Sequence, residues 1–181
     1  MNFKILTILV AILVSPVYMF SQCTFVSSAK TYDATCYQDL CFNETGSSCT
    51  GGSFSVSVVK NGKVGFFILR YAEVFDNYRG KVFIHLDDNT IITLIDKGKQ
   101  WKVNGNLFGQ FNLTEMEIKS LVNSNIRSIR FWLCSKHMPT DMCDSAIEYY
   151  NLEAEGIFLS QGIYFGRKSR IDFPSLISEL F

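Results

Sequence analysis

Alternation of apolar and polar residues dominates the middle of the chain. In the segment FSVSVV the apolar residues Phe54, Val56 and Val58 alternate with serines. This period of two is typical of a strand with one buried face. Asn61-Gly62 then supplies the dipeptide preferred in two-residue hairpin turns, and the following VGFFILRY is predicted to return as the partner strand.

The stretch VFIHLDDNTIITL predicts a second hairpin. Val82, Ile84 and Leu86 share one face, the polar DDNT bends the chain, and the β-branched IITLI runs back. Asp and Asn favour such bends because their short side chains hydrogen-bond to nearby backbone. A further Asn104-Gly105 in WKVNGNLFGQF predicts a third hairpin, so we expect an antiparallel meander.

One helix is predicted strongly in NLTEMEIKSLV. Thr114 can cap the amide of Glu117 while Glu117 reaches back, and Leu113 and Ile118 are spaced to form a hydrophobic staple around this capping box. IRSIRFWLC follows as a strand, with its Ile, Phe and Leu positions on one side and Ser, Arg and Trp on the other.

The last forty or so residues give mixed signals. GIFL and GIYF are typical of short strands separated by Ser-Gln-Gly. DFPSLISELF predicts a terminal helix with Asp172 near its start and Pro174 in its first turn, where proline is tolerated.

The expected fold class is α+β. We predict a mainly antiparallel β meander of hairpins, with the Thr114-capped helix packed on the sheet, a short C-terminal helix and a disulfide-stabilised amino-terminal segment. Residues 23–53 are rich in Ser, Thr, Gly and Cys with almost no period, so we expect them to be irregular and held by crosslinks.

The amino terminus predicts export. Lys4 precedes an apolar run over residues 5–14, and Ser15-Pro16 follows, which is the order of a secretory signal peptide. We assign residues 1–22 to this signal and residues 23–181 to one exported domain, secreted or periplasmic.

Cysteine content agrees with an oxidising compartment. The chain has six cysteines, at positions 23, 36, 41, 49, 134 and 143. They are interpreted as up to three disulfides, since the zinc-type and redox-type C-x-x-C spacing is absent. Cys134 with Cys143 is the simplest local pair, which leaves Cys23, Cys36, Cys41 and Cys49 to pair among themselves. The connectivity stays open.

A rival interpretation makes Cys23 the lipid-bearing first residue of a lipoprotein. Gln22 is a poor substitute for the small residue that precedes a lipidated cysteine, and lipidation would leave an odd number of thiols. Contact with a membrane is expected only under this alternative.

Charge excludes one large class of partners. Lys and Arg number 17 and Asp and Glu also number 17, so the chain is nearly neutral. The small basic cluster at Arg167, Lys168 and Arg170 cannot supply the field that nonspecific nucleic-acid binding requires, and we expect no nucleic-acid partner.

Candidate catalytic residues are few. CSKHMPTDMCD brings His137 and Asp141 between Cys134 and Cys143, and His85 is the second histidine of the chain. A small secreted hydrolase or metal-dependent enzyme using His137 and Asp141 is the alternative function. Oxidation of the two cysteines would remove the thiolates that metal or nucleophile chemistry needs, so no catalytic residue, metal or cofactor is assigned.

Candidate binding residues are aromatic. Trp132, Tyr149 and Tyr150 occur in patterns that could expose them near a rigid disulfide loop, although burial in the core is the usual fate of such rings. The sequence therefore favours an exported, disulfide-stabilised, non-catalytic binding or structural protein of the cell envelope. Its partner would be a protein or a glycan.

Overall fold

The computed structural model describes residues 22–27, 30–41, 54–72, 77–134, 146–151, 154–159, 163–168 and 170–181. Its strands are β1 (Gln22–Ser27), β2 (Lys30–Thr35), β3 (Gln38–Asp39), β4 (Phe54–Asn61), β5 (Val64–Ala72), β6 (Asn77–Leu86), β7 (Ile91–Ile95), β8 (Gln100–Val103), β9 (Asn106–Leu113), β10 (Ile126–Cys134), β11 (Ala146–Tyr150), β12 (Ala154–Leu159) and β13 (Ile163–Lys168). Its helices are α2 (Glu115–Asn123) and α3 (Phe173–Leu180). This composition confirms the predicted α+β class.

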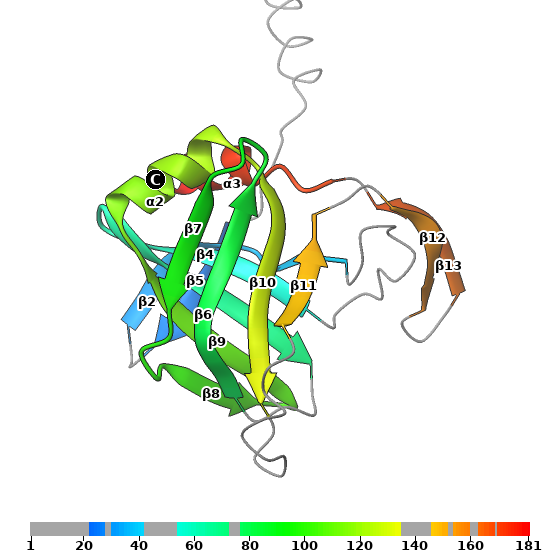
Figure 1. Ribbon diagram of the computed structural model, residues 1–181, viewed down its shortest axis with the longest axis horizontal. Coiled ribbons are helices and arrows are strands. Elements are labelled where there is room, and N and C mark those ends of the chain that lie inside the picture. Colours follow the sequence, from blue (N-terminus) through cyan, green and yellow to red (C-terminus); the bar gives the residue numbers. More distant parts are fainter. Residues whose placement is uncertain are drawn as a thin grey trace, which may run out of the picture.

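The described strands form two main antiparallel sheets. The larger has the order β1-β2-β4-β5-β9-β8, with β3 also paired to β4. The smaller has the order β11-β10-β6-β7, and β12 pairs with β13 in a separate hairpin. In Figure 1 the strands of the smaller sheet run across those of the larger one, which lies behind them. The sequence predicted the hairpins but not their division between two sheets.

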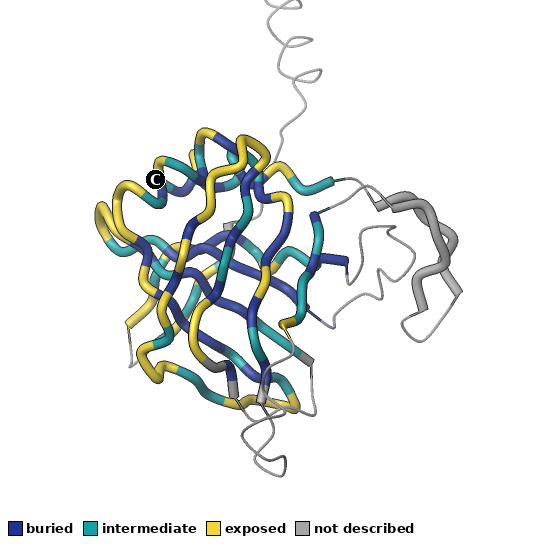
Figure 2. Tube along the Cα trace, in the orientation of Figure 1, coloured by how far each residue is buried: buried dark blue, intermediate teal, exposed yellow. Residues whose placement is uncertain are grey.

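The main core lies between the two sheets. Phe54 of β4 stacks on Tyr149 of β11 with ring centroids 4.4 Å apart and on Phe131 of β10 at 4.8 Å. All three rings are buried. Buried and exposed residues alternate along strands such as β7, as Figure 2 shows, because successive side chains point to opposite faces.

The hairpin turns follow the sequence signals with one correction. Asn104 and Gly105 both have positive φ, at 49° and 74°, as a type I′ turn requires. In the first hairpin, however, Asn61 pairs with Val64, so the loop is Gly62-Lys63 and not Asn61-Gly62. Gly62 has a φ of 68°, and a glycine at the first loop position suits a type II′ turn instead.

Both predicted helices are present and lie together at one end of the sheets (Figure 1). The capping box is formed, since Glu117 N donates to Thr114 Oγ1 at 3.3 Å and Thr114 N donates to Glu117 Oε2 at 2.6 Å. Asp172 caps α3 by accepting a hydrogen bond from Ser175 N. The apolar side of each helix closes this end of the core.

Asparagine side chains fix the approach to α3. Asn151 is buried, its Nδ2 donates to the carbonyls of Ile126 and Ile171, and its Oδ1 accepts from Ile171 N. Arg170 adds an ion pair to Asp87, with Nη2 and Oδ1 2.6 Å apart. The chain is thus tied to β10 immediately before the terminal helix begins.

The prediction of an irregular amino-terminal segment over residues 23–53 is wrong for residues 23–39. β1 and β2 form a regular antiparallel hairpin, and β3 adds a short pairing to β4. β2 pairs with β4 at Ala34 and Val59, and the sheet curls there, so that side chains of β1 and β2 pack on its outer side. Ser55 and Ser57, which alternation placed away from the core, are therefore buried as well. The alternation of apolar and polar residues did not predict this burial, because both faces of β4 are covered. Residues 42–53 lie outside the described part of the chain.

Candidate functional site

Aromatic residues gather on the outer face of the larger sheet. Trp101 of β8 lies opposite Phe108 of β9 in the ladder, and their rings stack with centroids 5.5 Å apart and planes 4° apart. Both side chains are partly exposed. The face turned away from the main core is therefore not an ordinary polar surface.

The hairpin of β1 and β2 supplies further rings to this face. Phe25 lies 6.0 Å from Trp101, and Tyr32 meets Phe66 of β5 edge to face at 5.8 Å. Beneath them, a second apolar cluster is built on three buried side chains from β2, β4 and β5. These are Ala34, Val59 and Ile68. The hairpin is held to the sheet by this small core.

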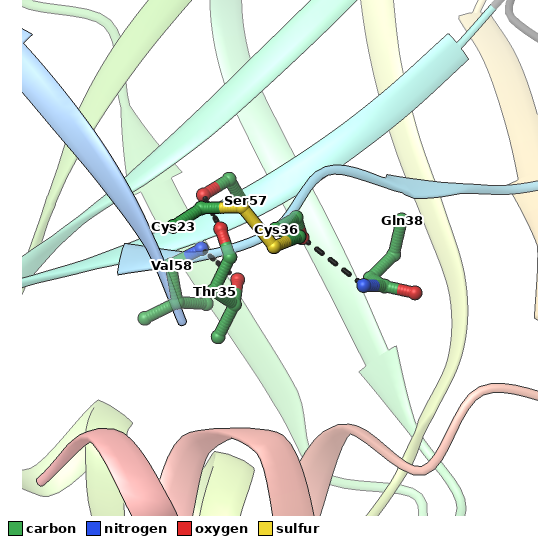
Figure 3. The surroundings of a disulfide bond; sticks show 6 residues. All are labelled: Cys23, Thr35, Cys36, Gln38, Ser57 and Val58. Carbon is green, nitrogen blue, oxygen red and sulfur yellow. Dashed lines mark hydrogen bonds between the residues drawn. A yellow bond between two sulfur atoms is a disulfide. The ribbon is translucent and has the colours of Figure 1, made fainter. Parts of the chain in front are cut away.

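A disulfide fixes the base of the hairpin. Cys23 and Cys36 are bonded, and Thr35 between them is clamped to β4 (Figure 3). The Thr35 carbonyl accepts from Ser57 Oγ at 2.6 Å, and Thr35 Oγ1 accepts from Val58 N at 2.9 Å. The disulfide closes the open end of the hairpin, and the two buried hydrogen bonds hold that end against β4.

A cleft of about 390 Å³ opens between this hairpin and the segment leading into β8. We call it the aromatic cleft. Its lining residues are Ser27, Tyr32, Phe66, Gly98, Lys99, Gln100, Trp101 and Gln110. The volume lies within the range of small-ligand sites, about 300–1,000 Å³.

Polar groups of the aromatic cleft are held in place. Gln100 Nε2 donates to the Tyr78 carbonyl at 2.8 Å and to Asp96 Oδ2 at 2.5 Å, while Gln100 Oε1 accepts from Tyr78 N at 2.7 Å. The backbone of Gln110 is bonded to Lys99, with N and O 2.9 Å apart. Lys99 Nζ lies 5.8 Å from the centre of the Phe66 ring. Fixed aromatic and polar groups of this kind suit recognition of a ligand.

The same face continues toward β3. Tyr37 lies 6.2 Å from Phe108, and the Arg70 guanidinium lies over the Tyr37 ring at 4.9 Å. Burial raises the pKa of Tyr37, and the charge of Arg70 opposes this shift. The phenol is therefore protonated at neutral pH and can donate a hydrogen bond.

A second hollow of about 320 Å³ lies beside α2. Its lining includes Ile118, Val122 and Phe181, and Lys119 on its edge is paired with Glu115 at 3.0 Å. Its apolar lining comes from side chains that also cover the end of the core. The aromatic cleft is the stronger candidate because three rings line it, whereas Phe181 is the one ring among the residues that line the second hollow.

His85 lies on the outer face of the smaller sheet, as its alternation with Ile84 and Leu86 predicted. It is opposite Ser128 in the ladder, and its Nε2 is buried without a hydrogen-bond partner. Ser128 Oγ donates directly to Glu148 Oε1 at 2.5 Å. A serine that donates to a carboxylate, beside a histidine with an unpaired Nε2, lacks the order of contacts in a catalytic triad.

The aromatic residues expected to bind do not form a common surface. Trp132 is partly exposed on the smaller sheet and packs against Phe83 at 5.8 Å. Tyr149 is wrong as a binding residue, because its ring is 2 % exposed and stacked inside the core. Tyr150 is half-buried, and its backbone pairs with Cys41.

The alternative catalytic residues His137 and Asp141 lie outside the described residues, as do Cys49 and Cys143. The side chain of Cys134 is likewise not described. Within the described part of the chain, no three His, Cys, Asp or Glu side chains form a group that could hold a metal ion. The hypothesis of a metal-dependent enzyme centred on His137 stays a prediction.

The cysteines described confirm that sulfur is used for crosslinks. Besides the bond between Cys23 and Cys36, Cys41 takes part in another disulfide. A lipid on Cys23 would need the sulfur atom that is bonded to Cys36 in this structure. The disulfide is therefore inconsistent with the lipoprotein alternative. Disulfides are typical of oxidising compartments outside the cytosol. Among the described helices, none has the length and apolar character to cross a bilayer.

Sequence reasoning missed Tyr32, Phe66 and Trp101. One signal was available for the third of these. A two-residue turn at Asn104-Gly105 pairs the residues on either side of it in order, and this register places Trp101 across from Phe108. Nothing local indicated that the hairpin of β1 and β2 would lie over them.

No family model, curated protein sequence or solved structure matches this chain. We therefore infer the function from the geometry and chemistry of the aromatic cleft.

Proposed function

We propose that this chain is an exported, non-catalytic binding protein that takes a small polar ligand in the aromatic cleft. The observation that carries the proposal is the convergence of Tyr32, Phe66 and Trp101 with the polar groups of Lys99 and Gln110 around one hollow. Small-molecule sites combine aromatic walls with a few placed polar groups in this way.

The chemistry of the lining favours binding over catalysis. Lys99 is its one charged side chain, and it is exposed. General acid-base catalysis needs groups matched to donate and accept a proton at a reacting atom. Amides, hydroxyls and aromatic rings supply hydrogen bonds and contact area instead, which is what retention of an unchanged ligand requires.

Export is part of the proposal. The disulfide between Cys23 and Cys36 agrees with an oxidising compartment, and the apolar run near the amino terminus is typical of a signal peptide removed after residue 21 or 22. The mass of the mature chain tests this. A mature protein that begins at Gln22 or Cys23 is expected, and one that retains Lys4 would contradict it.

Binding is tested by saturation-transfer NMR on the mature protein. The probes are a fixed panel of monosaccharides, disaccharides, amino acids, nucleosides and short fatty acids. At least one panel member should give a signal on the wild type that is lost in Trp101→Ala, because this ring forms a wall of the cleft.

Trp132→Ala is the matched control, since it removes the other tryptophan of the chain from the smaller sheet. The signal should persist in this variant. Lys99→Gln, at an exposed position, provides a second variant with no expected effect on folding. A panel with no binder, or a binder equally sensitive to both tryptophan variants, would overturn the assignment to the aromatic cleft.

A further inference from the structure

The geometry of the aromatic cleft points to a short acidic saccharide as its ligand. This inference rests on the proposed function and names the class of ligand. Three properties of the lining lead to it: ring faces, fixed polar groups and the sign of the charge.

The first property is the set of aromatic rings in the lining. Tyr32 of β2, Phe66 of β5 and Trp101 of β8 all line the cleft. A pyranose ring has C–H groups on its faces, and these carry partial positive charge toward the negative face of an aromatic ring. Rigid rings on a sheet stack on such a flat ligand at low conformational cost.

Polar groups come second. Ser27, Gln100 and Gln110 line the same hollow as the rings. Both N–H groups of the Gln100 amide are already used, so its position is fixed within the framework. A lipid chain would desolvate Ser27 and Gln110 without returning hydrogen bonds to them, which is unfavourable. A ligand with hydroxyl groups around an apolar ring satisfies both kinds of wall.

Charge comes third. Lys99 is the one charged residue of the lining, and no carboxylate lines it. Lys99 Nζ lies 5.8 Å from the centre of the Phe66 ring, so the ammonium is close to the rings that line the cleft. A single ammonium matches the carboxylate of one uronic acid, whereas a nucleotide phosphate group carries more charge than one exposed lysine balances.

Isothermal titration with cellobiouronic acid, a disaccharide with one carboxylate, tests the inference, with cellobiose as its neutral counterpart. Cellobiouronic acid should bind the wild type more tightly than cellobiose does. Lys99→Gln should weaken binding of the acid about fivefold and leave cellobiose unchanged, a size typical of an exposed charge pair. Lys97→Gln is the matched control, because Lys97 is exposed in the same segment but does not line the cleft.

The outcomes separate this inference from the proposed function. Equal binding of both disaccharides, or an acid preference that survives in Lys99→Gln, would overturn the acidic part. No heat with either sugar, together with a Trp101-dependent binder of another class in the NMR panel, would overturn the saccharide and leave the binding function standing. No binder of any class would overturn both.

Discussion

Asn151 shows how much one side chain can decide in this molecule. Its amide satisfies three backbone groups, on Ile126 and Ile171, at distances of 2.8–3.0 Å. The residue is 2 % exposed, so water cannot replace these hydrogen bonds. The path of the chain into α3 therefore depends on an asparagine that no sequence motif marked.

Asn151→Leu should lower the free energy of unfolding by about 2–4 kcal/mol, because it leaves buried backbone groups without partners. Urea denaturation measures this. Asn112→Leu makes the same replacement at an exposed position of β9 and should change stability by less than about 0.5 kcal/mol. Similar losses in the two variants would show that the buried network is unimportant.

Asp88 gives a prediction about pH. The Thr90 amide donates to its carboxylate at 2.9 Å and lowers the pKa of Asp88 below its ordinary value. A pKa lower in the folded than in the unfolded chain means that the ionised group stabilises the fold above the unfolded pKa. This contribution is lost as pH falls through the folded pKa.

Carbon-detected NMR titration of Asp88 should therefore give a midpoint below that of an unstructured Asp peptide. In Asp88→Asn the acceptor is kept but does not titrate, so the stability of this variant should depend less on pH at the acid end. A midpoint at or above the peptide value would contradict the hydrogen bond to Thr90.

At the scale of elements, the capping box of α2 shows a local rule that survives in the fold. Thr114→Ala removes the acceptor for Glu117 N and should cost about 1 kcal/mol of unfolding free energy. Thermal denaturation checks this. Thr114→Ser keeps the acceptor and should stay close to the wild type, and an equal loss in both variants would mean that the cap contributes nothing.

The hairpin of β1 and β2 depends on its crosslink. Cys23 and Cys36 are separated by 13 residues, and replacing both by Ser should lower unfolding free energy by about 3 kcal/mol. Urea denaturation without reductant measures the loss. Because the hairpin forms one wall of the aromatic cleft, Trp101 fluorescence should also shift to the red. Unchanged stability and fluorescence would show that the small core beneath the hairpin suffices.

At the scale of the whole molecule, both sheets share one core. Phe54 of the larger sheet stacks on Phe131 and Tyr149 of the smaller one, so neither sheet can open without exposing the other. We expect a single cooperative unfolding transition, as for most domains of this size.

The two tryptophans report on the two sheets separately. Trp132→Phe leaves Trp101 as the probe of the larger sheet, and Trp101→Phe leaves Trp132 as the probe of the smaller one. Within each variant, tryptophan fluorescence and the backbone signal from circular dichroism should give the same urea midpoint. Separate midpoints within one variant would contradict a single cooperative unit.

Agreement between sequence and structure was best where the signal was local. The hairpin bends at Asn89 and Asn104, the capping box at Thr114 and the Asp172 cap are all formed as predicted. Each depends on backbone geometry or on contacts within a few residues. The loop of the first hairpin moved by one position because ladder pairing, and not the preferred dipeptide, set it.

Agreement was poorest where burial came from distant parts of the chain. Tyr149 had the same local pattern as a surface residue, yet Phe54 and Phe131 enclose it. The sequence pattern did not indicate Trp101 or Phe66 as binding residues, although both line the cleft. Nothing within a strand tells which of its faces another sheet or hairpin will cover.

The sequence by itself determined the turns, the helix ends, the apolar face of most strands and the use of cysteine as a crosslink. These properties follow from local sterics, from a fixed period and from sulfur chemistry. Only the tertiary structure decided that the hairpins divide into two sheets and that the larger sheet curls, so that rings of the amino-terminal hairpin meet those of β5 and β8 beside a cleft. Those outcomes depend on which apolar surfaces meet in the folded chain. Such contacts join residues that are far apart in the sequence, so no short stretch contains both partners.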